Sequence, residues 1–115
     1  MAVLAIVEEM TFRSKLETAA AQLGVHLRVA TDAASILAQA AGGGWERVIL
    51  DLQLTSSDPL ALLQALRRAQ PALPIVGYCS HVERELQAQA QAAGCTQVVA
   101  RSTLAQHLPA FLTGG

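Results

Sequence analysis

The stretch Val48-Ile49-Leu50-Asp51-Leu52 combines a short apolar run with an acidic residue close to its end. A run of this length, rich in branched aliphatic residues, is typical of a strand that is buried on both faces of a sheet. Such strands belong to parallel sheets, whose faces are covered by helices. We therefore predict a buried strand centred on residues 48–50, with Asp51 at its carboxyl end.

On both sides of this strand, short strand-like runs alternate with longer stretches of helical period. Further strands are predicted over residues 2–7, 25–30, 75–78 and 96–100, and a helix is predicted over residues 82–93. The predicted helices have as their N-caps Thr11, Asp32, Asp58 and Ser102. Breaks are predicted at Gly24, at the glycine run 42–44, at Gly94 and near Pro109. Five strands alternating with five helices predict one α/β domain over residues 1–115, with a doubly wound five-stranded parallel sheet.

Charge and hydropathy exclude two classes of partner. The formal net charge is −1, and Arg67-Arg68 is the only basic pair. A chain of this kind lacks the basic stripe that neutralises phosphates, so no direct binding of nucleic acid is expected. Glu8 and Glu9 interrupt the first apolar run well before the length of a membrane span, so no membrane association is expected either.

The two cysteines, Cys79 and Cys95, lack the paired spacing of metal ligands and are too few for a disulfide scaffold. Buried thiols usually behave as small apolar side chains. The first residues run directly into a strand pattern without a basic segment, which is unlike a signal peptide. We therefore expect a location in the reducing cytoplasm.

Polar side chains gather at the predicted carboxyl ends of the strands, where parallel sheets bind their ligands. Glu8 and Glu9 follow the first strand and Asp51 ends the third. Carboxylates brought together in this way need a cation or a proton, and hard oxygen ligands suit Mg²⁺. Arg101 follows the fifth strand, and residues 79–81 end the fourth. Each of these residues alone is more often structural than functional, but their shared edge favours a functional pocket.

No motif indicates enzymatic chemistry. The chain has no glycine-rich phosphate loop, no G-x-S-x-G turn and no H-E-x-x-H sequence. His26, His81 and His107 fall on separate predicted elements without ligand spacing. We therefore do not expect an enzyme.

The pattern resembles the receiver domain of two-component response regulators over nearly the whole chain. Residues 48–52 are similar to the phosphoacceptor strand, residues 73–81 to the fourth strand and residues 94–101 to the approach to the fifth. The resemblance implies a flavodoxin-like receiver fold, with Asp51 as the acceptor of a phosphoryl group from a histidine kinase. It further implies Mg²⁺ bound by Glu8, Glu9, Asp51 and the backbone carbonyl of Gln53. Cys79, Ser80 and Arg101 fall where the family has a hydroxyl residue, a small residue and a lysine.

Several positions depart from the family pattern. Glu9 is one methylene longer than the usual aspartate, whereas Mg²⁺ demands close octahedral geometry. Cys79 is a weak hydrogen-bond donor, and the planar fork of Arg101 does not replace a point charge. Further departures are Ser102 in place of a proline whose cis peptide bond the family keeps, Pro59 in place of a glycine, and Val98 in place of the switch aromatic. The resemblance therefore implies an atypical receiver or pseudo-receiver.

Two functions from different classes remain open, and a third has little support. We predict a protein–protein interaction module with weak or no dependence on phosphorylation. Its partner would be a histidine kinase or another signalling protein. An output partner would bind the face formed by residues 82–100 and the last helix, where Gln87, Gln89, Gln91 and Gln97 carry no charge. The alternative is a conventional Mg²⁺-dependent receiver phosphorylated on Asp51. A flavodoxin-like ligand binder is the third reading, without a phosphate loop or an aromatic sandwich to support it.

Overall fold

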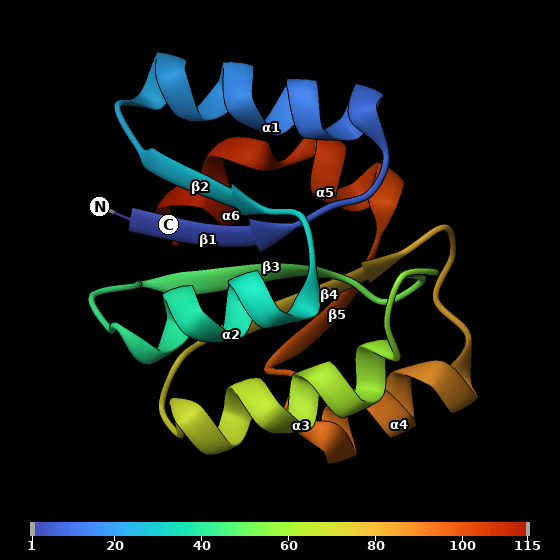
Figure 1. Ribbon diagram of the computed structural model, residues 1–115. Coiled ribbons are helices and arrows are strands. Elements are labelled where there is room, and N and C mark those ends of the chain that lie inside the picture. The colour runs from blue at the N-terminus through green and yellow to red at the C-terminus, as the bar shows by residue number, and fades with distance from the viewer. Residues whose placement is uncertain (1, 115) are drawn as a thin grey trace.

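The computed structural model describes residues 2–114 and contains one parallel sheet with helices on both faces (Figure 1). The strand order is β2-β1-β3-β4-β5, and every neighbouring pair is parallel. The strands are β1 (Ala2–Ile6), β2 (His26–Ala30), β3 (Arg47–Asp51), β4 (Ile75–Cys79) and β5 (Gln97–Ala100). The predicted α/β class and the five-stranded doubly wound sheet are confirmed.

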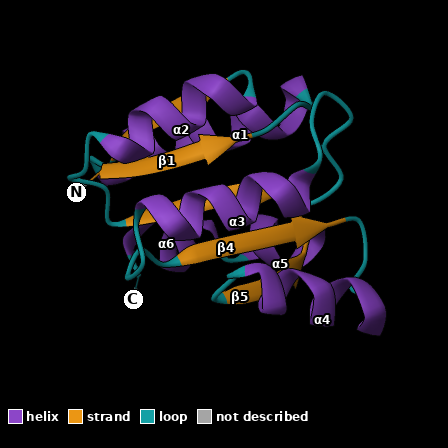
Figure 2. Ribbon diagram, turned by 60° about the horizontal axis from the view of Figure 1, so that its bottom comes forward, coloured by secondary structure: helices purple, strands orange, loops and turns teal. Residues whose placement is uncertain are grey.

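The helices form two layers, one on each face of the sheet (Figures 1 and 2). One layer consists of α1 (Met10–Leu23), α5 (Arg101–Gln106) and α6 (Leu108–Thr113). The other layer consists of α2 (Ala33–Ala41), α3 (Pro59–Ala69) and α4 (Arg84–Ala93). Between residues 2 and 114, no helix is both long enough and apolar enough to cross a membrane.

Side chains that alternate along the strands fill two apolar cores. On β3, Val48 and Leu50 pack towards α2, α3 and α4, whereas Ile49 packs towards α1, α5 and α6. All three side chains are fully buried. The core is almost entirely aliphatic, with one close aromatic pair between Phe12 and Tyr78, whose ring centroids are 5.0 Å apart. Burial on both faces explains why the sequence of β3 contains a continuous apolar run.

Two of the four predicted N-caps are confirmed. Asp32 accepts a hydrogen bond from the Ser35 backbone N–H at 2.7 Å and begins α2. Asp58 accepts hydrogen bonds from the backbone N–H groups of Leu60 and Ala61 and begins α3. In both cases the carboxylate satisfies amide groups that the first helical turn leaves free.

The other two predicted N-caps are wrong. The cap of α1 is Glu9 instead of Thr11, and its extended backbone makes the cap without a side-chain hydrogen bond. Ser102 does not cap α5, because this helix begins at Arg101 directly after β5 and leaves Ala100 at the cap position. A strand that runs straight into a helix leaves no room for a capping serine one residue later.

Two smaller corrections and one confirmed helix break concern the second half of the chain. The fourth helix begins at Arg84, two residues after the predicted Val82, with Glu83 at its cap. The last helix is broken at His107 into α5 and α6, and Pro109 lies in the first turn of α6, as a break near this proline requires. There are therefore six helices within residues 2–114 instead of five.

Candidate functional site

The register of the sheet brings the predicted site residues to one edge. Asp51 ends β3 and lies opposite Tyr78 of β4, and Cys79 at the end of β4 lies opposite Ala100 of β5. Glu8 and Glu9 lie between β1 and α1, and Arg101 opens α5. This edge is the one at which parallel sheets bind ligands.

Asp51 is a buried carboxylate, with 6% of its surface exposed. Its Oδ1 accepts a hydrogen bond from the Gln53 backbone N–H at 2.8 Å. Burial raises the pKa of Asp51, and the Gln53 hydrogen bond and the charge of Arg101 oppose that rise, whereas Glu8 and Glu9 add to it. The charged form of Asp51 therefore depends on nearby donors and positive charge.

Glu8 is held by the loop that connects β3 to α3. Its Oε1 accepts a hydrogen bond from the Thr55 backbone N–H at 2.6 Å, and its Oε2 accepts one from the Thr55 hydroxyl at 3.0 Å. The backbone hydrogen bond is the main reason why the pKa of Glu8 lies below its ordinary value. The exposed side chain of Glu8 is thus committed to Thr55, a contact across 47 positions of sequence.

Glu9 contacts a different residue, Arg101. Its Oε2 lies 3.6 Å from Nη1 of Arg101, and both side chains are partly exposed. Nε of Arg101 is buried and has no hydrogen-bond partner. The two neighbouring glutamates therefore contact different elements, the β3–α3 loop and the start of α5.

These contacts bear on the expected Mg²⁺ site. The carboxylate oxygens of Glu8, Glu9 and Asp51 are of the type that Mg²⁺ prefers. Nevertheless, among residues 2–114 no three His, Cys, Asp or Glu side chains converge closely enough to hold a metal ion. The residues lie at one edge as predicted. Mg²⁺ needs only one or two protein carboxylates together with waters and substrate oxygens, so Mg²⁺ binding by Glu8, Glu9 and Asp51 stays a prediction. The metal-ligand role of the Gln53 carbonyl remains a prediction.

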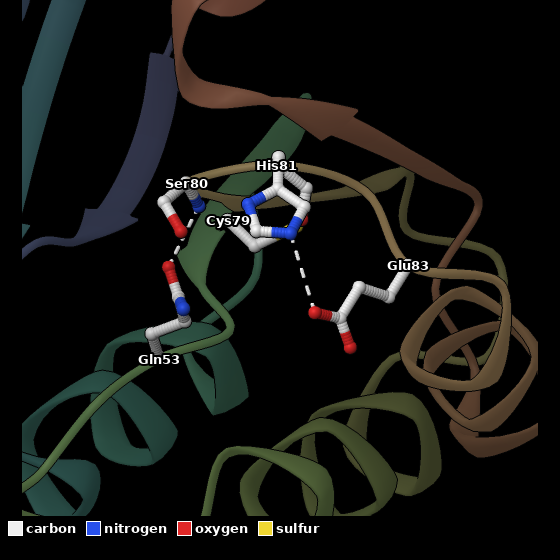
Figure 3. A network of polar contacts seen from close by, with 5 residues as sticks. All are labelled: Gln53, Cys79, Ser80, His81 and Glu83. Carbon is white, nitrogen blue, oxygen red and sulfur yellow. Dashed lines mark hydrogen bonds and ion pairs between the residues drawn. The ribbon is translucent and has the colours of Figure 1, made fainter.

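The end of β4 forms a separate network of polar contacts (Figure 3). The Gln53 side-chain oxygen accepts a hydrogen bond from the Ser80 backbone N–H at 2.7 Å and so joins two loops. The Cys79 thiol is fully buried, and its Sγ lies 3.2 Å from the backbone carbonyl oxygen of His81. Burial raises the pKa of Cys79, which keeps it a neutral thiol.

The ring of His81 adds an exposed contact to this network. Its Nε2 lies 3.2 Å from Oε1 of Glu83 (Figure 3), and both side chains are mostly solvent-exposed. An exposed pair of this kind contributes little to stability. His81 thus contacts Glu83, a residue of the same loop.

A cleft of about 340 Å³ opens beside the acidic edge, between the beginnings of α1 and α5. It is lined by Glu9, Thr11, Phe12, Lys15, Ser80, Arg101, Ser102 and Ala105. Arg101 and Ser80 therefore form part of its wall, as their positions at the strand ends suggest. Lys15 was not recognised from the sequence, since an exposed helical lysine carries no distinguishing pattern, and Thr11 was predicted only as an N-cap.

A family model for the response regulator receiver domain matches residues 3–112 of the chain. The chain belongs to this family. Receiver domains are signalling domains of two-component systems, and the membership agrees with the strand order and with an aspartate at the end of β3.

Solved structures of receivers share the fold of this chain at low sequence identity. The chemotaxis protein CheY4 of Vibrio cholerae is 19% identical with a TM-score of 0.86, covering 98% of this chain and 96% of that one. A two-component response regulator from Clostridium difficile is 17% identical with a TM-score of 0.87, covering 99% and 93%. A response regulator from Burkholderia pseudomallei is 22% identical with a TM-score of 0.84, covering 96% and 65%. No curated protein sequence matches the chain.

The structure also describes two positions that the resemblance predicts to be unusual for a receiver. Val98, which is predicted to stand in place of the switch aromatic, is buried within the core on the α2, α3 and α4 side. The described residues contain no cis peptide bond, so the bond between Arg101 and Ser102 is trans. Both positions lie on β5 or directly after it.

Proposed function

We propose that this receiver is atypical and acts as a protein–protein interaction module with weak or no dependence on phosphorylation of Asp51. The observation that supports this most is the commitment of the groups around Asp51 to internal contacts. Glu9 pairs with Arg101, Glu8 accepts from Thr55, and the Cys79 thiol lies against a main-chain carbonyl. These contacts already use part of the hydrogen-bonding capacity of each group before a phosphoryl oxygen or a metal arrives.

A second observation concerns the side chains that would transmit phosphorylation of Asp51 to the protein surface. Phosphorylation of an aspartate changes a distant surface when it shifts an element that has two stable arrangements. Cys79 is a weak donor in place of a hydroxyl, and Val98 is a short, buried side chain with no polar group to move. Neither side chain can rotate between two hydrogen-bonded positions, so neither would transmit the phosphorylation of Asp51 to the surface.

The proposed partners are a histidine kinase or another signalling protein, together with an output partner on the α4–β5–α5 face. Gln89, Gln91 and Gln97 are exposed there and Gln87 is half-buried. Uncharged polar groups of this kind do not repel a partner of either charge. The proposal includes no direct contact with nucleic acid or membrane, and a cytoplasmic location in which Cys79 and Cys95 stay reduced, as their free and buried thiols allow.

The test uses the complete regulator in its host and measures its output. We expect Asp51→Ala and Asp51→Asn to retain the wild-type output, because partner binding does not need the carboxylate. Asp58→Asn is the matched control, since it removes an acidic residue from the same loop region while preserving an N-cap. Complete loss of output in both Asp51 variants, with the control unaffected, would contradict the proposal.

The second candidate is a conventional receiver that accepts a phosphoryl group on Asp51 with Mg²⁺. The position of Asp51 at the end of β3 favours it, and the Burkholderia pseudomallei regulator was solved with a phosphorylated aspartic acid and a calcium ion. Incubation with acetyl phosphate and Mg²⁺, followed by intact mass measurement, distinguishes the two candidates. A stoichiometric phosphoryl adduct that disappears in Asp51→Asn would support this second candidate.

A further inference from the structure

The cleft between the beginnings of α1 and α5, here called the α1–α5 cleft, has the size and the lining of a small-molecule site. Its volume of about 340 Å³ falls within the range of ligand pockets, roughly 300–1,000 Å³. Phe12 of α1 and Ala105 of α5 supply apolar surface, and Thr11, Ser80 and Ser102 supply hydroxyl groups. A lining of this kind fits a ligand with an apolar body and a few polar atoms.

The charged residues of the lining favour a ligand with one negative charge. Two cations, Lys15 and Arg101, and one carboxylate, that of Glu9, line the cleft, so their formal charges sum to +1. Arg101 already lies beside Glu9, with Nη1 and Oε2 3.6 Å apart, and these two charges offset each other. Lys15 makes no ion pair with any residue between 2 and 114. Lys15 is therefore the cation that the lining leaves unbalanced.

The position of Lys15 on α1 brings it into line with other lining residues. It follows Thr11 by four positions and Phe12 by three, so these three side chains lie on one face of the helix. The ammonium group, a hydroxyl group and an aromatic side chain are thus presented together to the α1–α5 cleft. Ammonium and hydroxyl groups both donate hydrogen bonds, and an ionised acceptor strengthens such bonds.

Glu9 restricts which anion fits beside Lys15. A dianionic phosphate ester would bring two negative charges next to the Glu9 carboxylate, and the lining balances only one. A carboxylate carries a single negative charge and accepts hydrogen bonds through both of its oxygens. The charge of the lining therefore favours a monocarboxylate over a phosphate ester.

We infer that the α1–α5 cleft binds an organic monocarboxylate with a small apolar body, such as an aromatic carboxylate. The carboxylate pairs with Lys15 and accepts a hydrogen bond from Thr11, and the apolar body lies against Phe12 and Ala105. Asp51 does not line the cleft, so this ligand leaves its carboxylate free. The receiver thereby gains an input that needs neither a phosphoryl group nor a metal ion. The inference goes beyond the proposed function and does not depend on it.

The test titrates benzoate into the wild-type protein and follows the amide signals by proton–nitrogen NMR at constant ionic strength. Benzamide has the same ring without the charge, and phenyl phosphate has the ring with a second negative charge. We expect saturable benzoate binding with a Kd in the millimolar range and the largest shifts in residues 11–15 and 101–105. Benzamide and phenyl phosphate should each bind at least about threefold more weakly. Absence of saturable shifts in these residues, or equal binding of either comparison compound, would overturn the inference.

Three variants test the assignment of the ligand contacts. Lys15→Gln should weaken benzoate binding about three- to fivefold, the effect of one exposed ion pair. Arg13→Gln is the matched control, because it removes a cation of the same helix that does not line the cleft, and it should bind benzoate like the wild type. Ala105→Leu fills the cleft and should abolish binding.

Unchanged affinity in Lys15→Gln, or retained binding in Ala105→Leu, would place benzoate elsewhere and contradict the inference. A thermal scan of each variant verifies that the fold is kept, and Lys15→Gln changes only an exposed side chain. The measured quantity is ligand binding, whereas the Asp51→Ala experiment measures signalling output. The two proposals therefore fail independently.

Discussion

Replacing Arg67 by alanine should destabilise this receiver more than any other exposed or half-buried charge deletion that we consider. The Arg67 guanidinium connects the end of α3 to two loops at the edge opposite the site. Its Nε and Nη2 donate to the Gly94 carbonyl at 3.0 and 2.6 Å. Its Nη1 donates to the carbonyls of Gln70, Pro71 and Leu73, the last at 2.7 Å. One side chain therefore satisfies acceptors on the loops that precede both β4 and β5.

The expected loss follows from the number and burial of these hydrogen bonds. A hydrogen bond to a charged group contributes about 1.5–3 kcal/mol, and water recovers part of this at the exposed acceptors. Counting mainly the half-buried Gly94 and Leu73 carbonyls, we expect Arg67→Ala to lose about 3 kcal/mol of the free energy of unfolding. With an unfolding entropy near 2.1 cal/mol/K per residue, that loss lowers Tm by about 12 °C in a chain of this length.

Chemical denaturation and a thermal scan measure both quantities. Arg68→Ala is the matched control, because Arg68 is exposed and its Nε reaches only the Gln64 carbonyl at 3.5 Å. The control should change stability by less than about 0.5 kcal/mol. If Arg67→Ala proves as stable as Arg68→Ala, the assignment of Arg67 as the link between these loops is refuted.

Substitutions at three further positions test the account. At neutral pH, Asp51→Asn should unfold with a higher free energy than the wild type, because burial raises the pKa of Asp51 and disfavours its charge. Because its pKa is raised, the folded wild type binds more protons than the unfolded chain, so its free energy of unfolding rises as pH falls. The stability difference between Asp51→Asn and the wild type should therefore disappear below the ordinary pKa of 3.8. Urea titrations at several pH values measure this difference, and an Asn variant less stable than the wild type at neutral pH would contradict the prediction. Gly77→Ala should cost about 1–3 kcal/mol in the same assay, because its Cβ would lie 2.8–2.9 Å from Leu52 and Cys95 side-chain atoms; no loss would mean that these side chains move away freely. Asp58→Ala should lose about 1 kcal/mol through the N-cap of α3, whereas Asp58→Asn should keep most of that stability.

The features that could be predicted from the sequence are those set by neighbouring residues. Asp32 and Asp58 precede helical runs and cap them, because an N-cap depends on amide groups two or three positions ahead. The apolar run of β3 identified a strand buried on both faces for a similar reason. Thr11 and Ser102 were wrong because the ends of β1 and β5, not the capping preference, decided where the next helices start.

The contacts of the site could not be predicted, since they depend on side-chain directions across long stretches of sequence. The order of strands placed Glu8 and Glu9 near Asp51, yet their separate partners, Thr55 and Arg101, follow from the geometry of the β3–α3 loop and of the start of α5. Cys79 falls at the expected strand end, but only the structure reveals that its thiol lies against the carbonyl of His81. The sequence thus predicted where the site is, and the structure was needed to learn how its groups are engaged.

The most direct test of the central claim is a beryllofluoride and Mg²⁺ titration of the wild type, followed residue by residue in amide NMR spectra. Asp51→Asn is titrated in parallel to identify nonspecific effects. The account predicts that any shifts remain at the acidic edge, around Asp51 and Gln53, and do not reach Val98 or Gln97 on β5. Saturable shifts that spread to β5 and α4 in the wild type, and are absent in Asp51→Asn, would contradict it.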